Sequence, residues 1–294
     1  MREVRVVWAL LAADAVAIFV TYWRLPPADT YHVSLSGLDG GLSRVVVFLC
    51  FPTALAAIAI LGLLVERLPG RRAGPVALAA LLLCASVAWP GVVDQGDLDV
   101  KWSNAFAASG LLIVFVLSLL ARPPAERPAP SRAGDRLRLA VGALAVLLAA
   151  PWIAAELGLF LDGVPVLGSL FITGKMARVA GGGRMHAVHH GHHHGLDGLL
   201  LSLTALLLSR ALGSVRGRRL RALLGAYLAV LLVYGLTNMV NDAWDEQLYK
   251  REWTNWLVPG VLHPSASLPW AAMLVAAALI YVACLARRPL LARR

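Results

Sequence analysis

The sequence predicts an all-α fold, a polytopic bundle of about eight transmembrane helices with both termini in the cytoplasm. Hydrophobic residues make up 59% of the 294 residues and charged residues only 15%, and mean hydropathy is +0.71. Soluble domains carry about 25% charged residues. Apolar segments close to the roughly 20 residues that cross a bilayer recur along the chain. Basic residues gather in alternate loops, as positive cytoplasmic loops require.

Eight apolar segments are expected to cross the bilayer and to form one membrane domain over residues 1–294. They are residues 4–23, 44–65, 75–93, 104–121, 137–160, 196–215, 220–240 and 268–286. The first is followed by Arg24-Leu25-Pro26-Pro27 and not by a small-residue cleavage site, which indicates an uncleaved signal anchor. The apolar stretch 164–173 is too short to span, and we expect a re-entrant or interfacial piece there.

The charge distribution sets the expected orientation in the cell membrane. With the N-terminus inside, 19 of the 27 Lys and Arg residues fall on the cytoplasmic side and 8 on the outer side. The net charge of +10 therefore indicates orientation and contact with anionic lipid, and we expect no nucleic-acid partner. Cys50, Cys84 and Cys284 each lie in an apolar run, where cysteine behaves as a small hydrophobe, so we expect no disulfide framework.

Six of the eight histidines lie between residues 186 and 194, directly before the sixth span. If the helix extends upstream of Leu196, steps of four, three and four residues bring several of them onto one face with an aspartate. Imidazole and carboxylate together bind Zn²⁺, Fe²⁺, Cu²⁺ or Mn²⁺. A proton site, or a solvated His/Gly-rich loop that binds metal weakly, is the alternative. The candidate metal ligands are His186, His189, His190, His193 and Asp197.

The run His186-Ala-Val-His189-His190 resembles one histidine box, H-x-x-H-H, of the membrane fatty-acid desaturases and hydroxylases. That resemblance implies iron as the metal. It covers five residues, and the further boxes of that family are not present in this sequence. The family's boxes face the cytoplasm, whereas this one is expected outside.

A stripe of polar residues ends the seventh span at the expected outer boundary. Asn238, Asn241, Asp242 and Asp245 follow helical spacing and share one face. Paired carboxylates there can bind a divalent ion or carry out acid–base chemistry, whereas the simpler interpretation is a helix end that becomes a polar loop. The run Asn241-Asp-Ala-Trp-Asp245 resembles the N-D-x-x-D motif of UbiA-type prenyltransferases, which implies Mg²⁺ and a prenyl diphosphate. That match covers one motif of two.

Three further positions complete the candidate set. Asp97 belongs to an acidic loop, 94–99, and shares one helical face with Lys101 and Asn104 if the fourth span begins early. Glu156 lies near the outer end of the fifth span, and Asp14 lies in the middle of the first; carboxylates at membrane depth are functional candidates by default. Aromatic residues of the last outer loop, 244–269, are expected to anchor at the interface or to cover an outer cavity.

These patterns favour a metal-dependent membrane enzyme that acts on a lipid or lipid-linked substrate at the outer face. The histidines would hold the metal, and the candidate catalytic residues are Asp242, Asp245, Asn238, Asn241, Asp97 and Glu156. A transporter or metal-handling protein, and a non-catalytic subunit with haem between two outer histidines, are the alternatives. The sequence holds neither a G-x-x-x-x-G-K-[ST] loop nor a Gly-x-Ser-x-Gly motif, and it predicts no oligomeric state.

Overall fold

The structure, a computed structural model, describes residues 1–24, 34–70, 72–89, 92, 99–122, 134–159, 161, 163–170, 172–178, 184–188 and 194–286. These residues are mainly helical, as predicted. The helices are α1 (Arg2–Arg24), α2 (Gly37–Leu49), α3 (Pro52–Leu64), α4 (Ala73–Ala85), α5 (Asn104–Leu120), α6 (Asp135–Leu148), α7 (Ala150–Glu156), α8 (His194–Ser209), α9 (Arg218–Trp244) and α10 (Leu268–Ile280). Strands β1 (Met176–Arg178) and β2 (Arg184–His186) form a small antiparallel hairpin.

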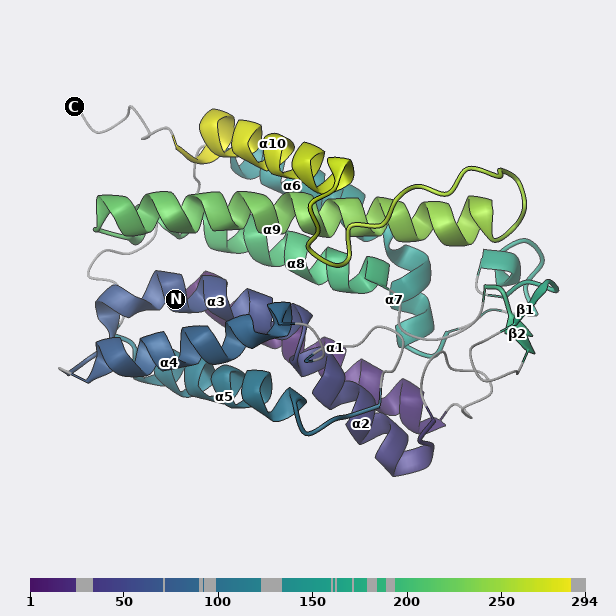
Figure 1. Cartoon of the computed structure of the whole chain (residues 1–294), viewed down its shortest axis with the longest axis horizontal. Coiled ribbons are helices and arrows are strands. Elements are labelled where there is room, and N and C mark those ends of the chain that lie inside the picture. Colours follow the sequence, from purple (N-terminus) through teal and green to yellow (C-terminus); the bar gives the residue numbers. More distant parts are fainter. Residues whose placement is uncertain are drawn as a thin grey trace.

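The helices form two groups, and α9 runs the whole length of one group (Figure 1). Helices α8 and α10 pack beside α9, while α3, α4 and α5 form the second group and α1 packs against α2. We call one end the basic end; it comprises Met1–Glu3, Glu66–Arg67, Asp135–Arg138 and 210–217. The opposite end, with the β1–β2 hairpin and residues 244–267, is the loop end.

Four helical segments are long and apolar enough to cross a membrane: Arg2–Arg24, Gly37–Arg67, Arg218–Tyr249 and Leu268–Leu285. Helices α6 and α7 add a fifth if this pair, bent by 60°, is one broken span. The other predicted spans correspond to shorter apolar helices, Ala73–Ala88, Asn104–Leu120 and His194–Ser209. The short stretch predicted at 164–173 contains a 3-10 turn, Gly168–Leu170, at the loop end.

Two boundaries differ from the prediction for identifiable reasons. The second helix begins at Gly37 and not at residue 44, because its glycines allow close packing on α1: a Cβ at Gly41 would lie 2.8 Å from the Phe19 carbonyl oxygen. The third segment ends at Ala88 and not at residue 93. Trp89 is extended, with ψ of 133°, as expected of a residue that precedes a proline.

Two predicted spans are interrupted where a proline follows. Helix α3 starts with Pro52, and α7 carries Pro151 in its first turn. Proline has no N–H to donate and its ring clashes with the preceding turn, so a helix ends or bends there. The bend between α6 and α7 directs Glu156 toward α1, where the Thr21 hydroxyl donates to the Glu156 carbonyl oxygen at 2.6 Å.

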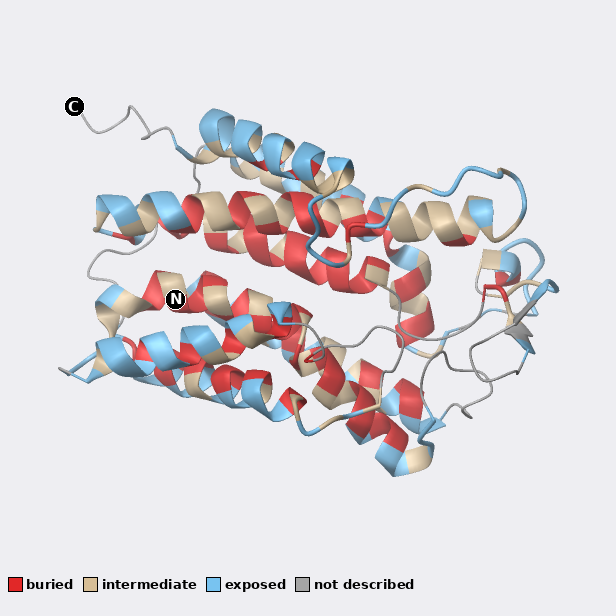
Figure 2. Cartoon of the chain, in the orientation of Figure 1, coloured by how far each residue is buried: buried red, intermediate tan, exposed pale blue. Residues whose placement is uncertain are grey.

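The buried surface lies between the two groups of helices, and the outer surface is apolar. Figure 2 shows buried residues along the facing sides of α3, α8 and α9 and exposed ones over α10 and the outer sides of α4 and α5. Leucines such as Leu119, Leu147 and Leu279 are about two-thirds exposed or more. Contiguous apolar surface on this scale is unusual for a protein in water and is the normal state of a helix in lipid.

Small residues set the distance between α8 and α9. A Cβ at Gly198 would lie 2.4 Å from the Gly235 carbonyl oxygen, and a Cβ at Gly235 would lie 2.5 Å from both the Gly198 carbonyl oxygen and Ser202 Oγ. No real side chain tolerates such distances, so only glycine fits at both positions. Close backbone contact between small residues is a common source of helix association in membranes.

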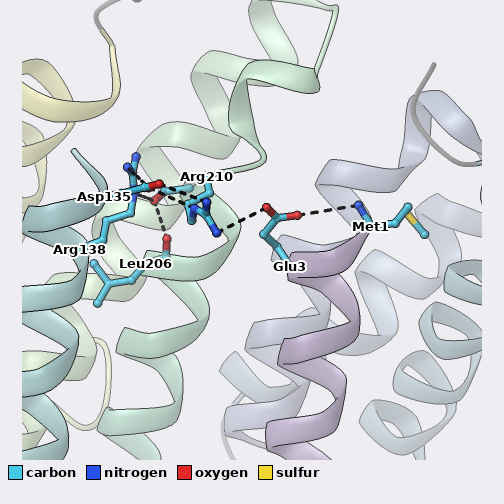
Figure 3. A network of polar contacts seen from close by, with 7 residues as sticks. Met1, Glu3, Asp135, Arg138, Leu206 and Arg210 are labelled. Carbon is cyan, nitrogen blue, oxygen red and sulfur yellow. Dashed lines mark hydrogen bonds and ion pairs between the residues drawn. The ribbon is translucent and has the colours of Figure 1, made fainter. Parts of the chain in front are cut away.

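Ion pairs connect three helices at the basic end (Figure 3). The Arg210 guanidinium donates to both Asp135 oxygens at 3.1 Å and lies 3.9 Å from the Glu3 carboxylate, whose side chain is buried. Nearby, the Glu66 carboxylate accepts the backbone N–H groups of Arg216 and Gly217, each at 2.7 Å, where α9 begins. Four segments predicted on one side of the bilayer therefore meet at one end of the molecule.

Replacing Gly235 by leucine should lower the free energy of unfolding by about 1–3 kcal/mol or prevent folding, because the added side chain overlaps α8. Unfolding in mixed detergent micelles, followed by circular dichroism, measures the change. Gly74→Ala is the matched control, since nothing lies within 4 Å of a Cβ there. Equal stability of both variants would mean that α8 and α9 do not pack in this way.

Replacing Arg210 by methionine should lower the free energy of unfolding by about 1–3 kcal/mol, because it leaves Glu3 and Asp135 without their shared cation. The same unfolding assay applies. Arg219→Met removes an exposed arginine from the same end and should change stability little. An equal loss in the two variants would show that net charge, and not this network, is responsible.

Candidate functional site

Two sequence motifs, far apart along the chain, meet where α8 begins beside the last turns of α9. The Gly195 backbone N–H donates to Asp242 Oδ2 at 2.8 Å. Asp242 belongs to the predicted polar stripe, and Gly195 follows the predicted histidine segment directly. A carboxylate that accepts from a first-turn N–H stabilises the start of a helix and complements its dipole. The contact therefore places the stripe at the point where the histidine segment enters α8.

A second carboxylate lies in the first turn of α8. Asp197 is buried, and its Oδ2 is 3.9 Å from His194 Nδ1. The next residue, Gly198, packs on Gly235 and Met239, so this turn lies against the turn of α9 that carries Asn238. Asp197 and Asp242 thus belong to one junction of two helices, which the sequence alone did not reveal.

The members of the polar stripe make different contacts. Buried Asn238 donates to the Tyr234 carbonyl oxygen at 3.0 Å, within its own helix. Asn241 donates to the Val258 carbonyl oxygen at 3.1 Å and thereby holds the last loop against α9. Asp245 lies 3.0 Å from Lys250 Nζ. The predicted helical face is present as far as Asp242, and Asp245 then opens a π-helical turn, Asp245–Tyr249.

The expected helical face through the histidines is wrong for His186. Helix α8 begins only at His194, and His186 ends strand β2, whose pairing with β1 extends the backbone. Its Nδ1 is 2.5 Å from the Thr173 carbonyl oxygen. Because a carbonyl only accepts, Nδ1 must carry the proton, and in the neutral ring Nε2 then keeps its lone pair. Metal-binding histidines are commonly oriented in this way.

Several predicted site residues lie outside the described residues, namely the candidate ligands His189, His190 and His193 and the candidate catalytic residue Asp97. Within the described ranges, no three His, Cys, Asp or Glu side chains are close enough to hold a metal ion together. The expected face shared by Lys101 and Asn104 does not form, because α5 starts at Asn104 and the Lys101 N–H donates to Asn104 Oδ1 at 2.7 Å.

Glu156 is almost fully buried in α7 and lies one turn beyond Trp152. The Trp152 ring occupies the space above Gly195, where an added Cβ would be 2.3 Å from it. Helix α7 therefore closes the third side of the α8–α9 junction. Glu156 ends this helix, and its backbone carbonyl oxygen is bonded to α1.

Sequence reasoning missed the cations that hold the loop end together. The Arg251 guanidinium donates to the Ser169 carbonyl oxygen and to Gln247 Oε1, and Lys175 pairs with Glu252 at 2.6 Å. Burial acts to lower the pKa of Lys250, but the neighbouring charges of Glu246 and Asp245 raise it above its usual value. The spacing of Glu246 and Lys250, four residues apart, was the available signal.

Comparison with known proteins gives no relative: no protein-family model matches the chain, and neither a curated protein nor a solved structure matches it.

Proposed function

We propose that this chain is a multi-pass protein of the cell membrane that crosses the bilayer eight times, with the basic end in the cytoplasm and the loop end outside. The meeting of four basic segments at one end supports this orientation. The three shorter apolar helices would provide the other three crossings. The longer helices that pack beside them would span the part of the bilayer thickness that the short helices do not cover. The lipid bilayer would then be the first partner of the chain.

We infer that the α8–α9 junction binds a divalent transition metal, Zn²⁺, Fe²⁺, Cu²⁺ or Mn²⁺. The observation that carries this inference is the Gly195–Asp242 hydrogen bond. It places a carboxylate of the polar stripe beside the residue that directly follows the histidine segment. Asp197 and Asp242 would supply carboxylates, and the histidines of residues 186–194 would supply imidazole nitrogens. Mixed nitrogen and oxygen ligands of this kind suit these metals.

The function that this site supports best is metal-dependent catalysis on a lipid or lipid-linked substrate. A bound metal can generate hydroxide near neutral pH or polarise a phosphoryl or carbonyl group. With Asp242 as a ligand, Asp245, which directly follows α9, could serve as the general base, and Asn238 and Asn241 lie in the last turns of the same helix. A site at the end of membrane helices is within reach of molecules that lie in the bilayer, so a lipid-like substrate fits its position.

Metal content tests the site. Detergent-purified protein should hold about one equivalent of a transition metal by elemental analysis, and a variant with His186, His189, His190 and His193 changed to alanine should lose it. Asp242→Asn keeps an acceptor for the Gly195 N–H and removes the charge, so it should weaken metal binding with little loss of stability. His263→Ala, an exposed histidine elsewhere in the loop end, is the control.

Metal-free protein that is folded, with a flat visible spectrum, would overturn the metal site. A haem band would instead assign the histidines to a non-catalytic subunit. Metal retained by the histidine variant would place the ion elsewhere in the chain.

Cysteine labelling tests the orientation. In a Cys284→Ala background, which removes the exposed thiol, Ser265→Cys reports on the loop end and Gly213→Cys on the basic end. A membrane-impermeant maleimide added to intact cells should label only Ser265→Cys, because the reagent cannot cross the bilayer to reach the other position. Labelling of Gly213→Cys alone would reverse the orientation, and labelling of both in intact cells would argue against a membrane-spanning chain.

A further inference from the structure

An apolar groove lies where α4 ends and α5 begins, away from the α8–α9 junction. Its volume is about 430 Å³, and its walls include Leu82, Ala85 and Trp89 from the α4 side and Phe106 from α5. Among the described residues that line the groove, Ser86 alone carries a hydroxyl, which donates to the Leu83 carbonyl oxygen at 2.7 Å. The groove therefore offers its occupant hydrocarbon contact, and this hydroxyl is already bonded within the wall.

The groove follows from the way α4 and α5 pack. The two helices touch at Gly110, where an added Cβ would be 2.7 Å from the Cys84 backbone nitrogen. One turn nearer the loop end, α5 carries Phe106 in place of a glycine, and the chain after α4 presents Trp89. The helices are in contact at the glycine, and beyond it the groove is lined by the partly exposed aromatic side chains of Phe106 and Trp89.

The depth of the groove is set by helix length. The Arg122 N–H donates to the Arg67 carbonyl oxygen at 3.1 Å, so α5 ends at the basic end beside the start of α4. The 17 residues of α5 rise about 26 Å, which is less than the roughly 30 Å of a hydrocarbon core. Figure 1 shows α9 continuing well past the ends of α4 and α5 toward the loop end. With the transmembrane placement proposed above, the groove would therefore lie at acyl-chain depth in the bilayer and not at its surface.

We propose that this groove binds one acyl chain of a phospholipid from the leaflet at the loop end; the proposal rests on the transmembrane placement proposed above. At that depth the surrounding solvent is hydrocarbon, and an empty recess would forfeit dispersion contacts along both walls. Trp102 lies edge-on to Phe106 with ring centroids 5.9 Å apart and is itself 81% exposed. Tryptophan prefers the headgroup boundary, so the acyl chain enters past Trp102 and runs down along Phe106.

Photo-crosslinking in nanodiscs tests this proposal on the full chain. The probe is a phosphatidylcholine with a diazirine in the middle of one acyl chain, and mass spectrometry maps the labelled residues. We expect labelling of residues 82–89 and of Phe106 several-fold above that of Leu112 and Leu119, which are more exposed than Phe106 on the same helix. Ala85→Trp fills the groove and should abolish this excess, with Ala85→Phe as a milder filling if the first variant folds poorly.

Leu112→Trp is the matched control, because it adds the same ring on a lipid-facing position outside the groove. Labelling that only follows exposure, and is unchanged by Ala85→Trp, would overturn the groove as a lipid site while the helices remain in the bilayer. Absence of labelling on α10 and on every other apolar helix would instead overturn the transmembrane placement, and the groove proposal with it.

Discussion

The close approach of α8 and α9 is the contact on which the loop end depends. Because Gly198 and Gly235 let the two backbones meet, the first turn of α8 reaches the side chains of the last turns of α9. The Gly195 N–H then bonds to Asp242, and Asn241 and Trp244 are left to hold the returning loop through the Val258 and Trp256 carbonyl oxygens. A larger residue at either glycine would move each of these groups together, since all are on the same two helices.

The distribution of polarity is consistent with this packing and with a bilayer around it. Charges concentrate at the two ends, where they are partnered: Arg210 by Glu3 and Asp135, and Lys250 by Asp245. Between the ends, leucine, valine and alanine cover the outside of α4, α5, α6 and α10. In water such a surface would drive aggregation, whereas in lipid it costs nothing, so helix association must come from close packing and a few polar contacts. Tyr227, whose hydroxyl donates to the Leu55 carbonyl oxygen, is one such contact.

The sequence predicted the helices well and the contacts between distant residues only in part, and the reason is the range of the interactions. Apolar runs are local, so each predicted span coincides with a helix or a broken pair of helices. The start of the second helix was missed because glycines in a sequence indicate a loop, whereas here they allow close packing of the helix on α1. His186 was placed on a helix because step counting ignores hairpin pairing with a strand eight or more residues away. The meeting of Asp197 with the end of α9 is a tertiary contact, and no spacing within either segment encodes it.

The proposed metal would lie beside a helix N-terminus, where the helix dipole repels a cation. Asp197 and Asp242 compensate for this repulsion. The first turn of a helix carries partial positive charge, which repels a cation. Asp242 offsets that charge by accepting the Gly195 N–H, and Asp197 adds a second negative charge within the same turn. A carboxylate oxygen has two lone pairs, so it can accept an N–H and still face a metal ion. The same residue would then stabilise the helix and supply a ligand, and only replacement by an isosteric neutral side chain separates the two roles.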